Sequence, residues 1–354
     1  MHQKNIRVLV VGCGNMGISH AHAYENHSGF TICGLVSRGP SKEKLNASLK
    51  GDYPLFDDFE VALEASAPDA VCISTYPETH ESYTLMALEK GCHVFLEKPI
   101  ATTVEGGKRI MEKALALDKK VVVGYILRHH PIWNRFIEEA QKMGKPLVMR
   151  MNLNQQSQGY MWDVHKNLMQ SLSPIVDCGV HYLDVMCQMT QATPLSVSAI
   201  GVRLTDEIPD TNYNYGQLQI RFDDGSVGWY EAGWGPMVSE TAFFVKDVFG
   251  PKGSVSLTQD NKQSDDIDGH TKTDQMLIHH SAINKQNEFI QKDQYINFDD
   301  APDHQQLCDN EQTYFFNAIA QQLDLIDHLQ QAISSLQIAL ACDESVKTGK
   351  TVLL

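Results

Sequence analysis

The sequence lacks the features that would place it among membrane, secreted or nucleic-acid-binding proteins. No segment approaches the roughly 18 consecutive apolar residues that a membrane-spanning helix requires. The first apolar run leads directly into a glycine-rich turn, so we expect no signal peptide and a cytoplasmic protein. Acidic residues outnumber basic ones by 44 to 29, and the net charge of -15 argues against nucleic acid or an anionic membrane as the main partner.

Closely spaced cysteine pairs are also missing. The chain has 8 cysteines, and no two of them form a CxxC motif. They are scattered through apolar segments, which predicts reduced and mostly buried thiols in place of a disulfide framework or a thiolate zinc site. The histidine pairs at 129–130 and 279–280 have no cysteine or carboxylate at a ligand spacing, so no metal is expected.

The order of predicted elements changes near residue 125, and a chain of 354 residues is long enough for two domains. In residues 1–124, short β-branched runs alternate with amphipathic segments, which is typical of βα units and a doubly wound parallel sheet. The fold class is therefore α/β for this part. The expected strands are 6–11, 31–36, 70–75, 93–97 and 120–125.

Residues 125–354 predict a second, α+β domain. A charged helix leads into strand-like runs, and the Asp-Gly turn at 223–226 predicts a hairpin. We expect an open, mainly antiparallel sheet, long loops over 258–310, and a closing helical segment that ends at Gly349. The expected strands are 147–153, 195–204, 215–222, 226–234 and 240–250.

The segment GCGNMG, residues 12–17, directly follows the first predicted strand. Gly12, Gly14 and Gly17 have the GxGxxG spacing: the first allows a tight turn, the second lets a pyrophosphate approach the backbone, and the third lets the helix pack on the strand. Because the motif opens a series of βα units, it predicts a dinucleotide-binding Rossmann domain. A purely structural tight turn is the alternative.

The end of the second strand bears on the choice of dinucleotide. An NAD enzyme usually carries Asp or Glu there, about 20 residues after the turn, to hold the ribose 2'-hydroxyl. This chain has Ser37 and Arg38, followed by Lys42. A hydroxyl and two cations suit a 2'-phosphate, which a carboxylate would repel. We therefore expect NADP to be favoured over NAD.

Residues 175–189 combine an apolar helix with a narrow polar line. At 100° per residue, Asp177, His181, Asp184 and Gln188 fall within about a 60° arc, and the remaining residues are almost all apolar. Such a helix is expected to be buried, with its polar line facing partners, a cavity or a ligand. Asp177 and His181 are one turn apart, so the carboxylate can orient the ring as a general base requires. A satisfied polar network between two domains is the alternative.

These segments, in this order, resemble the Gfo/Idh/MocA family, the glucose-fructose oxidoreductase and inositol dehydrogenase relatives. The resemblance rests on GCGNMG, on TYPETHESYTLMALEKGCHVFLEKP at 75–99 and on DCGVHYLD at 177–184, and it covers nearly the whole chain. It implies a Rossmann domain followed by an α/β domain whose open sheet forms a homodimer or homotetramer. It also implies hydride transfer between a nicotinamide cofactor and a sugar or polyol substrate.

The resemblance implies a role for individual residues. Lys98, of the Glu-Lys-Pro tripeptide, would face the nicotinamide and the substrate hydroxyl, and His181 would accept the proton with Asp177 beside it. The expected catalytic residues are thus Lys98, His181 and Asp177. The expected cofactor-binding residues are Gly12, Gly14, Asn15, Met16, Gly17, Ser37, Arg38, Lys42, Thr75, Glu97, Lys98 and Arg128.

The stretch YMWDVHKNLMQSLSPIVD, residues 160–177, departs from the Trp-Arg and Gly-Gly pattern of many relatives. Its aromatic and hydrogen-bonding side chains suit a polyol or sugar, although some of them can simply pack or pair at the domain boundary. The expected substrate-binding residues are Lys98, Tyr160, Trp162, Asp163, His165, Asp177 and His181. An NAD-dependent glycosidase, a non-catalytic dinucleotide sensor and a dihydrodiol or imine-type reductase stay open as alternatives.

Overall fold

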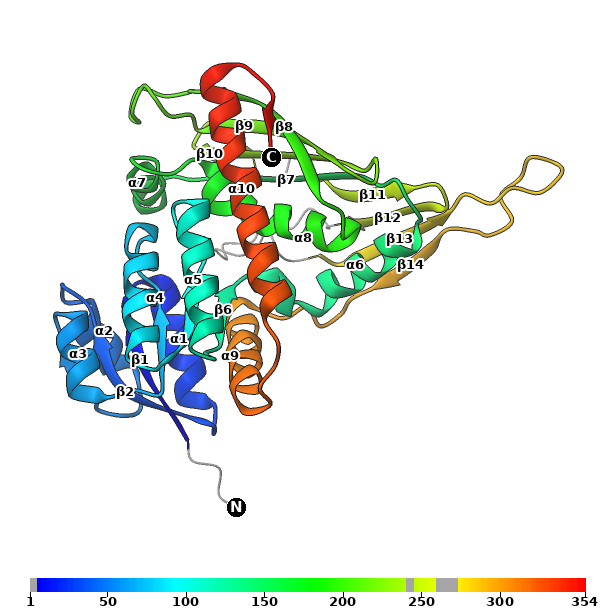
Figure 1. Cartoon of the computed structure of the whole chain (residues 1–354). Coiled ribbons are helices and arrows are strands. Elements are labelled where there is room, and N and C mark those ends of the chain that lie inside the picture. The colour runs from blue at the N-terminus through cyan, green and yellow to red at the C-terminus, as the bar shows by residue number, and fades with distance from the viewer. Residues whose placement is uncertain (1–4, 240–244, 259–272) are drawn as a thin grey trace. The chain divides into compact units, whose positions relative to one another are not determined.

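The protein is described by a computed structural model that covers residues 5–239, 245–258 and 273–354 (Figure 1). The chain forms two compact units. The first comprises the residues up to His129 together with Asp303–Ile333, and the second comprises His130–Pro302 together with Ser334–Leu354. The first segment ends five residues after the predicted boundary at 124, and nothing in the sequence indicated that 303–333 belong to the first unit.

The first unit contains a six-stranded parallel sheet in the order β3-β2-β1-β4-β5-β6. This is the strand order of a dinucleotide-binding Rossmann domain. Its strands are β1 (Ile6–Val11), β2 (Phe30–Val36), β3 (Leu55–Phe56), β4 (Ala70–Ile73), β5 (His93–Glu97) and β6 (Val121–Gly124). The five strands predicted from the sequence are confirmed. The sequence did not indicate β3, because two residues are too short to show a periodicity.

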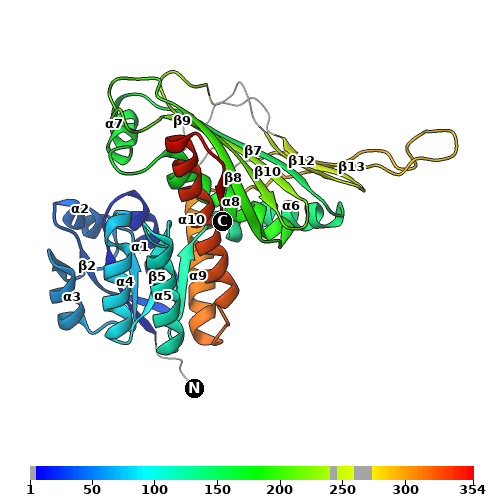
Figure 2. The ribbon, with the colours of Figure 1, turned by 45° about the horizontal axis from the view of Figure 1, so that its top comes forward.

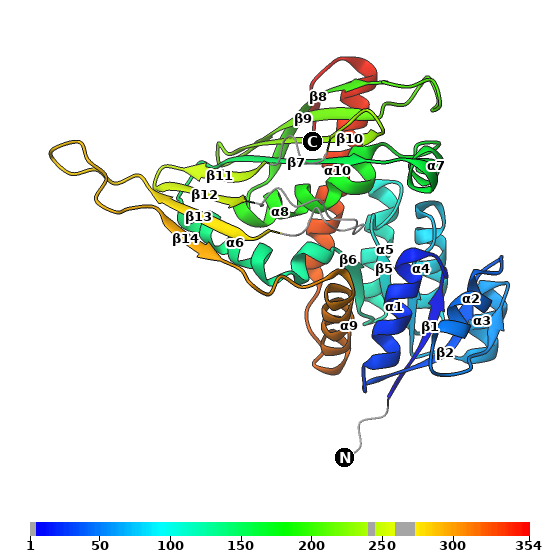
Figure 3. The same ribbon diagram turned by 180° about the vertical axis from the view of Figure 1, so that it is seen from behind.

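Helices surround this sheet. They are α1 (Asn15–Asn26), α2 (Ser41–Ser48), α3 (Phe59–Ser66), α4 (His80–Glu89), α5 (Val104–Ala116) and the short helices η1 (Pro77–Thr79) and η2 (Ile126–His129). A further helix, α9 (His304–Ala320), packs against α1, as Figure 3 shows. Its Phe315 is fully buried in the core of the sheet, near Phe30 and Phe95.

The second unit contains a nine-stranded sheet in the order β14-β13-β12-β11-β7-β10-β9-β8-β15. Among the described strands of this second sheet, only the β10–β7 pair is parallel, so the prediction of a mainly antiparallel sheet is confirmed. The strands are β7 (Val148–Gln156), β8 (Pro194–Val202), β9 (Tyr215–Phe222), β10 (Val227–Gly235), β11 (Lys246–Gly250), β12 (Gly253–Thr258), β13 (Gln275–His280), β14 (Gln294–Asn297) and β15 (Val352–Leu353). The predicted hairpin joins β9 and β10.

One face of this sheet carries α6 (Pro131–Lys142) and α8 (Val180–Thr190), which lie side by side in Figure 2. The ring of Tyr182 on α8 stacks on Tyr230 of β10, with 5.1 Å between the centroids. A π-helical turn, η3 (Ile175–Gly179), precedes α8, and α7 (Gly159–Leu168) precedes that turn. The last helix, α10 (Ile326–Thr348), contributes residues to both units.

The prediction of long loops over 258–310 is wrong for several segments of its described part. Strands β13 and β14 lie there, and α9 begins at His304 behind a capping box formed by Asp303 and Gln306. Charged and amide residues interrupt the apolar pattern of these elements, so their periodicity is weak. Residues 259–272 of the predicted loops and 240–244 of a predicted strand lie outside the described residues.

Lys246 of β11 is an ionisable group in the core beneath α8. Its side chain is 2 % exposed, its Nζ donates to the backbone oxygen of Asn152, and it lies 4.8 Å from the ring centroid of Tyr182. Burial lowers the pKa of Lys246 to about 7, although the charge of Glu231 acts in the opposite direction. The folded state therefore holds this amine largely neutral at mildly alkaline pH.

This burial predicts a pH dependence of stability. Above about pH 7 the folded chain has released a proton that the unfolded lysine keeps up to its ordinary pKa, so the free energy of unfolding rises with pH. We expect a gain on the order of 2 kcal/mol between about pH 7 and pH 9, and Lys246→Met should lack it. Urea unfolding curves of both proteins at the two pH values measure the difference; parallel pH dependences would contradict the prediction.

Candidate active site

The glycine turn connects β1 to α1 at the carboxyl edge of the first sheet. Gly12 has a φ of 92°, and a Cβ at this position would lie 2.3 Å from the backbone oxygen of Ser74, just after β4. A Cβ on Gly17 would lie 1.8 Å from the oxygen of Gly12. Both glycines are therefore required by backbone packing. The turn lies between β1 and β4, where the order of successive strands reverses and open α/β sheets bind ligands.

Gly14 differs from these two glycines. Among the described residues, no heavy atom lies within 4 Å of a Cβ built on Gly14. Gly14 is the N-cap of α1, so no side chain caps the N–H groups of the first turn. This turn, which includes Asn15 and Met16, contains no acidic residue. The N–H groups of this turn thus face a space that a phosphate can approach, with the helix dipole favouring negative charge. These residues fit a dinucleotide pyrophosphate.

In the structure, the ammonium group of Lys42 pairs with neighbouring carboxylates. Its Nζ lies 2.7 Å from Asp57 Oδ1 and 3.3 Å from Glu43 Oε1, and it donates to the oxygen of Gly39. Ser37 Oγ is hydrogen-bonded to Ser41 Oγ at 2.7 Å, and Arg38 is exposed. Of the two cations predicted to meet a 2'-phosphate, Arg38 is thus the more accessible.

His80 connects two segments at the carboxyl edge of the sheet. The buried ring lies 2.7 Å from the oxygen of Pro99, after β5, and 3.0 Å from the oxygen of Thr75, after β4. Burial lowers the pKa of His80, and the hydrogen bonds to the two carbonyl oxygens counteract this in part. Thr75 Oγ1 is also bonded to Thr79 Oγ1 at 2.7 Å. The predicted cofactor residue Thr75 and the Glu-Lys-Pro tripeptide are therefore held to one another through a histidine that the sequence analysis did not select.

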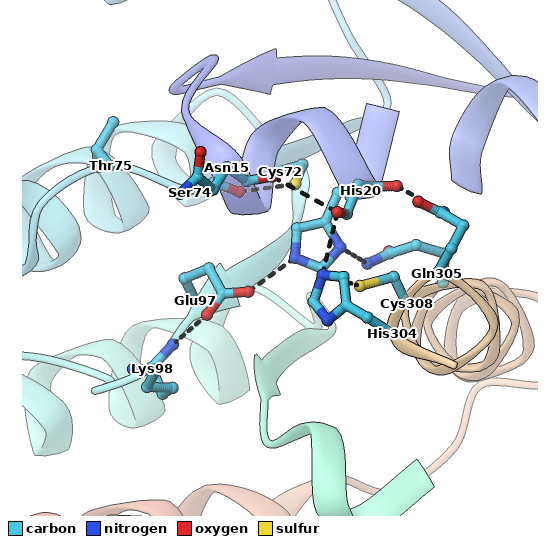
Figure 4. A network of polar contacts seen from close by, with 12 residues as sticks. Asn15, His20, Cys72, Ser74, Thr75, Glu97, Lys98, His304, Gln305 and Cys308 are labelled. Carbon is cyan, nitrogen blue, oxygen red and sulfur yellow. Dashed lines mark hydrogen bonds and ion pairs between the residues drawn. The ribbon is translucent and has the colours of Figure 1, made fainter. Parts of the chain in front are cut away.

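Glu97 and Lys98 lie at the end of β5, and Figure 4 shows them together with His20. Glu97 is 6 % exposed, and its Oε1 lies 2.7 Å from Nε2 of the fully buried His20. Its Oε2 accepts a hydrogen bond from the backbone N–H of Lys98 at 3.2 Å. Lys98 itself is half-buried. The carboxylate of Glu97 is thus fixed at both oxygens.

Arg128 belongs to η2, after β6. Its Nη1 lies 2.8 Å from Nδ1 of His328 on α10, and its guanidinium carbon is 5.2 Å from the centroid of the Tyr125 ring. The backbone nitrogen of Val123 in β6 lies 2.8 Å from Nε2 of the same His328 ring. Arg128 is therefore anchored to the end of β6. A contact between Arg128 and a cofactor stays a prediction.

In the second unit, Asp177 and His181 lie at the start of the α8 segment. Asp177 is in the π-helical turn η3 and His181 is in the first turn of α8. Both are partly exposed, whereas most of the residues around them are buried. Asp184, one turn further on, is 1 % exposed and accepts a hydrogen bond from Gln188 at 2.8 Å. The predicted burial of this helix is confirmed, and its accessible polar groups are concentrated near η3, a kind of turn that is frequent at functional sites.

The predicted substrate residues 160–166 lie on α7. Tyr160 is 72 % exposed, whereas Trp162 is 6 % exposed and its indole N–H donates to Glu207 at 3.1 Å. Lys166 lies 2.8 Å from Glu207 and 3.0 Å from the exposed Asp163. The structure therefore gives most of these side chains packing or pairing roles, the alternative considered above.

His165 on α7 is also buried. Its ring stacks on Trp234 with 4.3 Å between centroids, and its Nδ1 lies 3.0 Å from Ser157 Oγ. Burial lowers the pKa of His165 to about 4, and the negative charge of Asp177 counteracts this only in part. His165 is thus a neutral ring near Asp177 at physiological pH, and a contact with substrate stays a prediction.

Besides His80, the sequence analysis missed two polar residues of the first unit. His20 lies on the buried side of α1, and Gln312 is fully buried on α9 with its amide 3.0 Å from His20 Nδ1. A histidine among Gly17, Ala21 and Tyr24 on the apolar side of a helix was the only available signal. Gln312 had none, because the sequence gives no indication that α9 packs on α1.

The fold and the glycine turn define the class: this is a protein with a dinucleotide-binding Rossmann domain and a second, sheet-based domain. The chain belongs to the Gfo/Idh/MocA family. Residues 6–125 match the profile described as "Oxidoreductase family, NAD-binding Rossmann fold", and residues 135–256 match the "GFO/IDH/MocA C-terminal domain". The resemblance inferred from the sequence is confirmed.

Curated relatives carry dehydrogenase names. D-glucoside 3-dehydrogenase of Escherichia coli K12 is 26% identical over 285 residues, which are 73% of this chain and 78% of that protein. Inositol 2-dehydrogenase of Corynebacterium glutamicum strain R is 32% identical over 198 residues, which are 55% of this chain and 57% of that enzyme. The match thus spans little more than half the length of the inositol dehydrogenase.

Solved structures share the whole fold. An oxidoreductase from Thermotoga maritima has a TM-score of 0.79 at 23% identity and covers 99% of this chain and 98% of its own. Scyllo-inositol dehydrogenase of Lactobacillus casei, solved with NAD(H) and scyllo-inositol, has a TM-score of 0.77 at 19% identity, with 99% of each chain covered. At these identities the likeness establishes the fold. No helix in the described parts of the chain is long and apolar enough to cross a membrane.

Proposed function

We propose that this protein is a nicotinamide-dependent dehydrogenase or reductase that acts on a secondary alcohol or ketone of a sugar, sugar derivative or cyclitol. One observation carries the proposal: Glu97 and Lys98 lie at the carboxyl end of β5, in the same sheet whose β1–β4 switch point has a glycine turn that fits a pyrophosphate. The names of the glucoside and inositol dehydrogenases among the relatives support the substrate class.

In the proposed mechanism, a bound nicotinamide supplies a carbon, C4, that accepts or returns a hydride. The ammonium of Lys98 stabilises the negative charge that develops on the substrate oxygen as its proton leaves. His181 takes that proton, and Asp177 holds the imidazole in the orientation that this transfer requires. Oxidation thus removes one hydride and one proton from the alcohol, and reduction of the ketone returns both.

A substrate panel tests the proposed function. Purified protein is incubated with cyclitols, aldoses, glycosides and their keto forms, each with NAD(H) and NADP(H), and absorbance of the reduced nicotinamide is followed. We expect turnover with at least one polyhydroxylated substrate. Tight dinucleotide binding without turnover on the whole panel would identify a sensor, and release of an aglycone without net reduction would identify a glycosidase; either result overturns the proposal.

We further propose a preference for NADP. The exposed Arg38 and the hydroxyl of Ser37 at the end of β2 support it, although Lys42, paired with Asp57, contributes less than its position in the sequence suggested. The expected result is a higher kcat/KM with NADP than with NAD on the best substrate of the panel. A kcat/KM that favours NAD by about tenfold or more, equivalent to about 1.4 kcal/mol, would contradict this preference.

We also propose that the protein is a cytoplasmic homodimer or homotetramer that associates through its larger sheet. The eight cysteines are free thiols, which suits a reducing compartment. On the sheet face opposite α8, Ile200 is 59% exposed and Val202 is 44% exposed, so this face offers apolar surface to a second copy. Light scattering measures the mass in solution, and a monomer at micromolar concentration would exclude the assembly.

A further inference from the structure

A chain of buried hydrogen bonds extends from α9 to the Glu-Lys-Pro tripeptide within the first unit. The amide nitrogen of Gln312 lies 3.0 Å from Nδ1 of His20, and Nε2 of His20 lies 2.7 Å from Oε1 of Glu97. Glu97 Oε2 then accepts from the N–H of Lys98. Gln312 and His20 are both 0 % exposed, so water does not compete for these bonds. Figure 4 shows how His20 and Glu97 lie between α1 and β5.

The bond from Gln312 determines which nitrogen of His20 carries the proton. An amide N–H can only donate, so Nδ1 of His20 must present its lone pair to Gln312. A neutral imidazole has a single N–H, which is then at Nε2 and donates to the carboxylate of Glu97. With the other tautomer, two donors would face each other at Nδ1, and a lone pair would face the carboxylate at Nε2.

The orientation of Glu97 matters because it precedes Lys98 directly. A hydrogen bond to a carboxylate is about twice as strong as one between neutral groups, and a fixed carboxylate in turn holds the N–H of Lys98. The side chain also needs room: a Cβ on Gly124, at the end of β6, would lie 3.2 Å from Glu97 Oε1. The backbone from which the Lys98 ammonium extends is therefore supported from α1 and, through Gln312, from α9.

We propose that His20 and Gln312 are positioning residues for hydride transfer: Gln312 sets the tautomer of His20, and His20 holds Glu97 and, through it, the backbone of Lys98. This inference rests on the proposed function, because it assigns the two residues to the same reaction. Neither residue is placed in contact with a substrate. A residue more than 200 positions after Lys98 in the sequence thus tunes the catalytic lysine because α9 packs on α1.

A metal site is a competing interpretation of the same cluster. Ligand atoms of His20, Cys308 and Glu311 lie within 4.8 Å of one another, and all three residues are buried. Both ring nitrogens of His20, however, already have partners in Glu97 and Gln312. A metal would have to break one of these bonds, so the positioning role is the one that the geometry favours.

The kinetic test compares variants that keep and remove the N–H donor. His20→Leu and Gln312→Leu should lower kcat by about 10- to 100-fold, as is typical when a residue that orients a functional side chain is removed. The KM for the alcohol should change much less. His20→Gln, which keeps a donor, should recover most of the loss. No recovery in His20→Gln would overturn the proposal, because it would show that only ring packing matters.

Two matched controls lie on the same pair of helices. His22 of α1 contacts Ser48, and Gln305 of α9 donates to the backbone oxygen of Ser19, so neither bonds to His20 or Glu97. His22→Leu and Gln305→Leu should keep nearly normal kcat. A loss in Gln305→Leu as large as that in Gln312→Leu would overturn the proposal, since the α1–α9 contact as a whole would then be responsible.

A double variant identifies the route of the effect. If His20 acts through Glu97, His20→Leu should cost little further activity in a Glu97→Gln background, where the charged acceptor is already absent. If the fold-loss of kcat in the double variant equals the product of the losses in the two single variants, the proposal is overturned. If the wild-type protein is inactive on the whole substrate panel, the proposed function fails instead. The tautomer of His20 can be measured without any activity.

The tautomer can be observed directly by NMR of protein with ¹⁵N-labelled histidine, with the His20 signals assigned from the His20→Gln variant. We expect a neutral ring protonated at Nε2, and loss of this preference in Gln312→Leu. A ring protonated at Nδ1 alone or at both nitrogens would overturn the proposal. Zinc added to metal-free protein should leave the signals unchanged, and stoichiometric zinc binding at His20 would overturn it in favour of the metal site.

Discussion

Replacement of Lys98 with methionine is expected to lower kcat by about 10²- to 10⁴-fold while cofactor affinity changes little. The half-buried Lys98 follows β5 at the carboxyl edge of the parallel sheet, the edge at which such sheets bind ligands. Methionine keeps much of the length and apolar body of the side chain and removes its charge. The loss should therefore appear in the chemical step. Steady-state kinetics on the best substrate and a fluorescence titration with reduced cofactor separate the two quantities.

Lys120 provides a matched control. It immediately precedes β6, at the opposite edge of the same sheet, where its Nζ lies 3.8 Å from Asp118. Lys120→Met should retain nearly normal kcat and cofactor affinity. Near-normal turnover in Lys98→Met, or an equal loss in both variants, would contradict the assignment of Lys98 as the residue that stabilises the developing alkoxide.

The second large effect is expected for His181→Ala, which should also lower kcat by about 10²- to 10⁴-fold because the proposed proton acceptor is removed. His181 is partly exposed in the first turn of α8, directly after the π-helical turn that contains Asp177. The alanine variant should bind the dinucleotide normally. Kinetics over a range of pH are the measurement, since loss of the acceptor should also change the pH profile of kcat.

Asp177 is expected to act through His181. Asp177→Asn should lower kcat, and the double variant with His181→Ala should be scarcely slower than His181→Ala alone. Gln188→Ala is the matched control, because Gln188 lies on the same helix and bonds to the buried Asp184. Full activity in His181→Ala would remove this residue from the mechanism, and a Gln188→Ala variant as slow as His181→Ala would point to a structural role of the helix.

Local sequence patterns were sufficient to predict the fold of the dinucleotide-binding domain. Each strand from β1 to β6 except the two-residue β3 has a short β-branched run, and the glycines of residues 12–17 follow the first one. These features depend on neighbouring residues only: a parallel strand is buried on both faces, and the turn needs glycine where a Cβ would meet backbone. The fold class and the position of the turn could therefore be predicted.

Pairing between segments that lie far apart in the chain was harder to predict from the sequence. Strands β13 and β14 were predicted as loops, because they join the sheet through cross-strand partners that lie elsewhere in the sequence. Lys42 illustrates the same point for a side chain. Its position after the second strand suggested a phosphate contact, but Asp57, fifteen residues later, pairs with it. Whether a polar side chain is accessible depends on neighbours that the local sequence does not reveal.

The sequence by itself determined that the chain has a Rossmann domain, a dinucleotide turn, a Glu-Lys-Pro tripeptide and an Asp177–His181 segment, because these follow from spacing along a few consecutive residues. Only the tertiary structure decided that Asp303–Ile333 join the first unit and that Gln312 and His20 hold Glu97. It also decided that Trp162 and His165 are packed in the second unit. The physical reason is that burial and hydrogen-bond partners result from the packing of segments far apart in the chain, which no local spacing encodes.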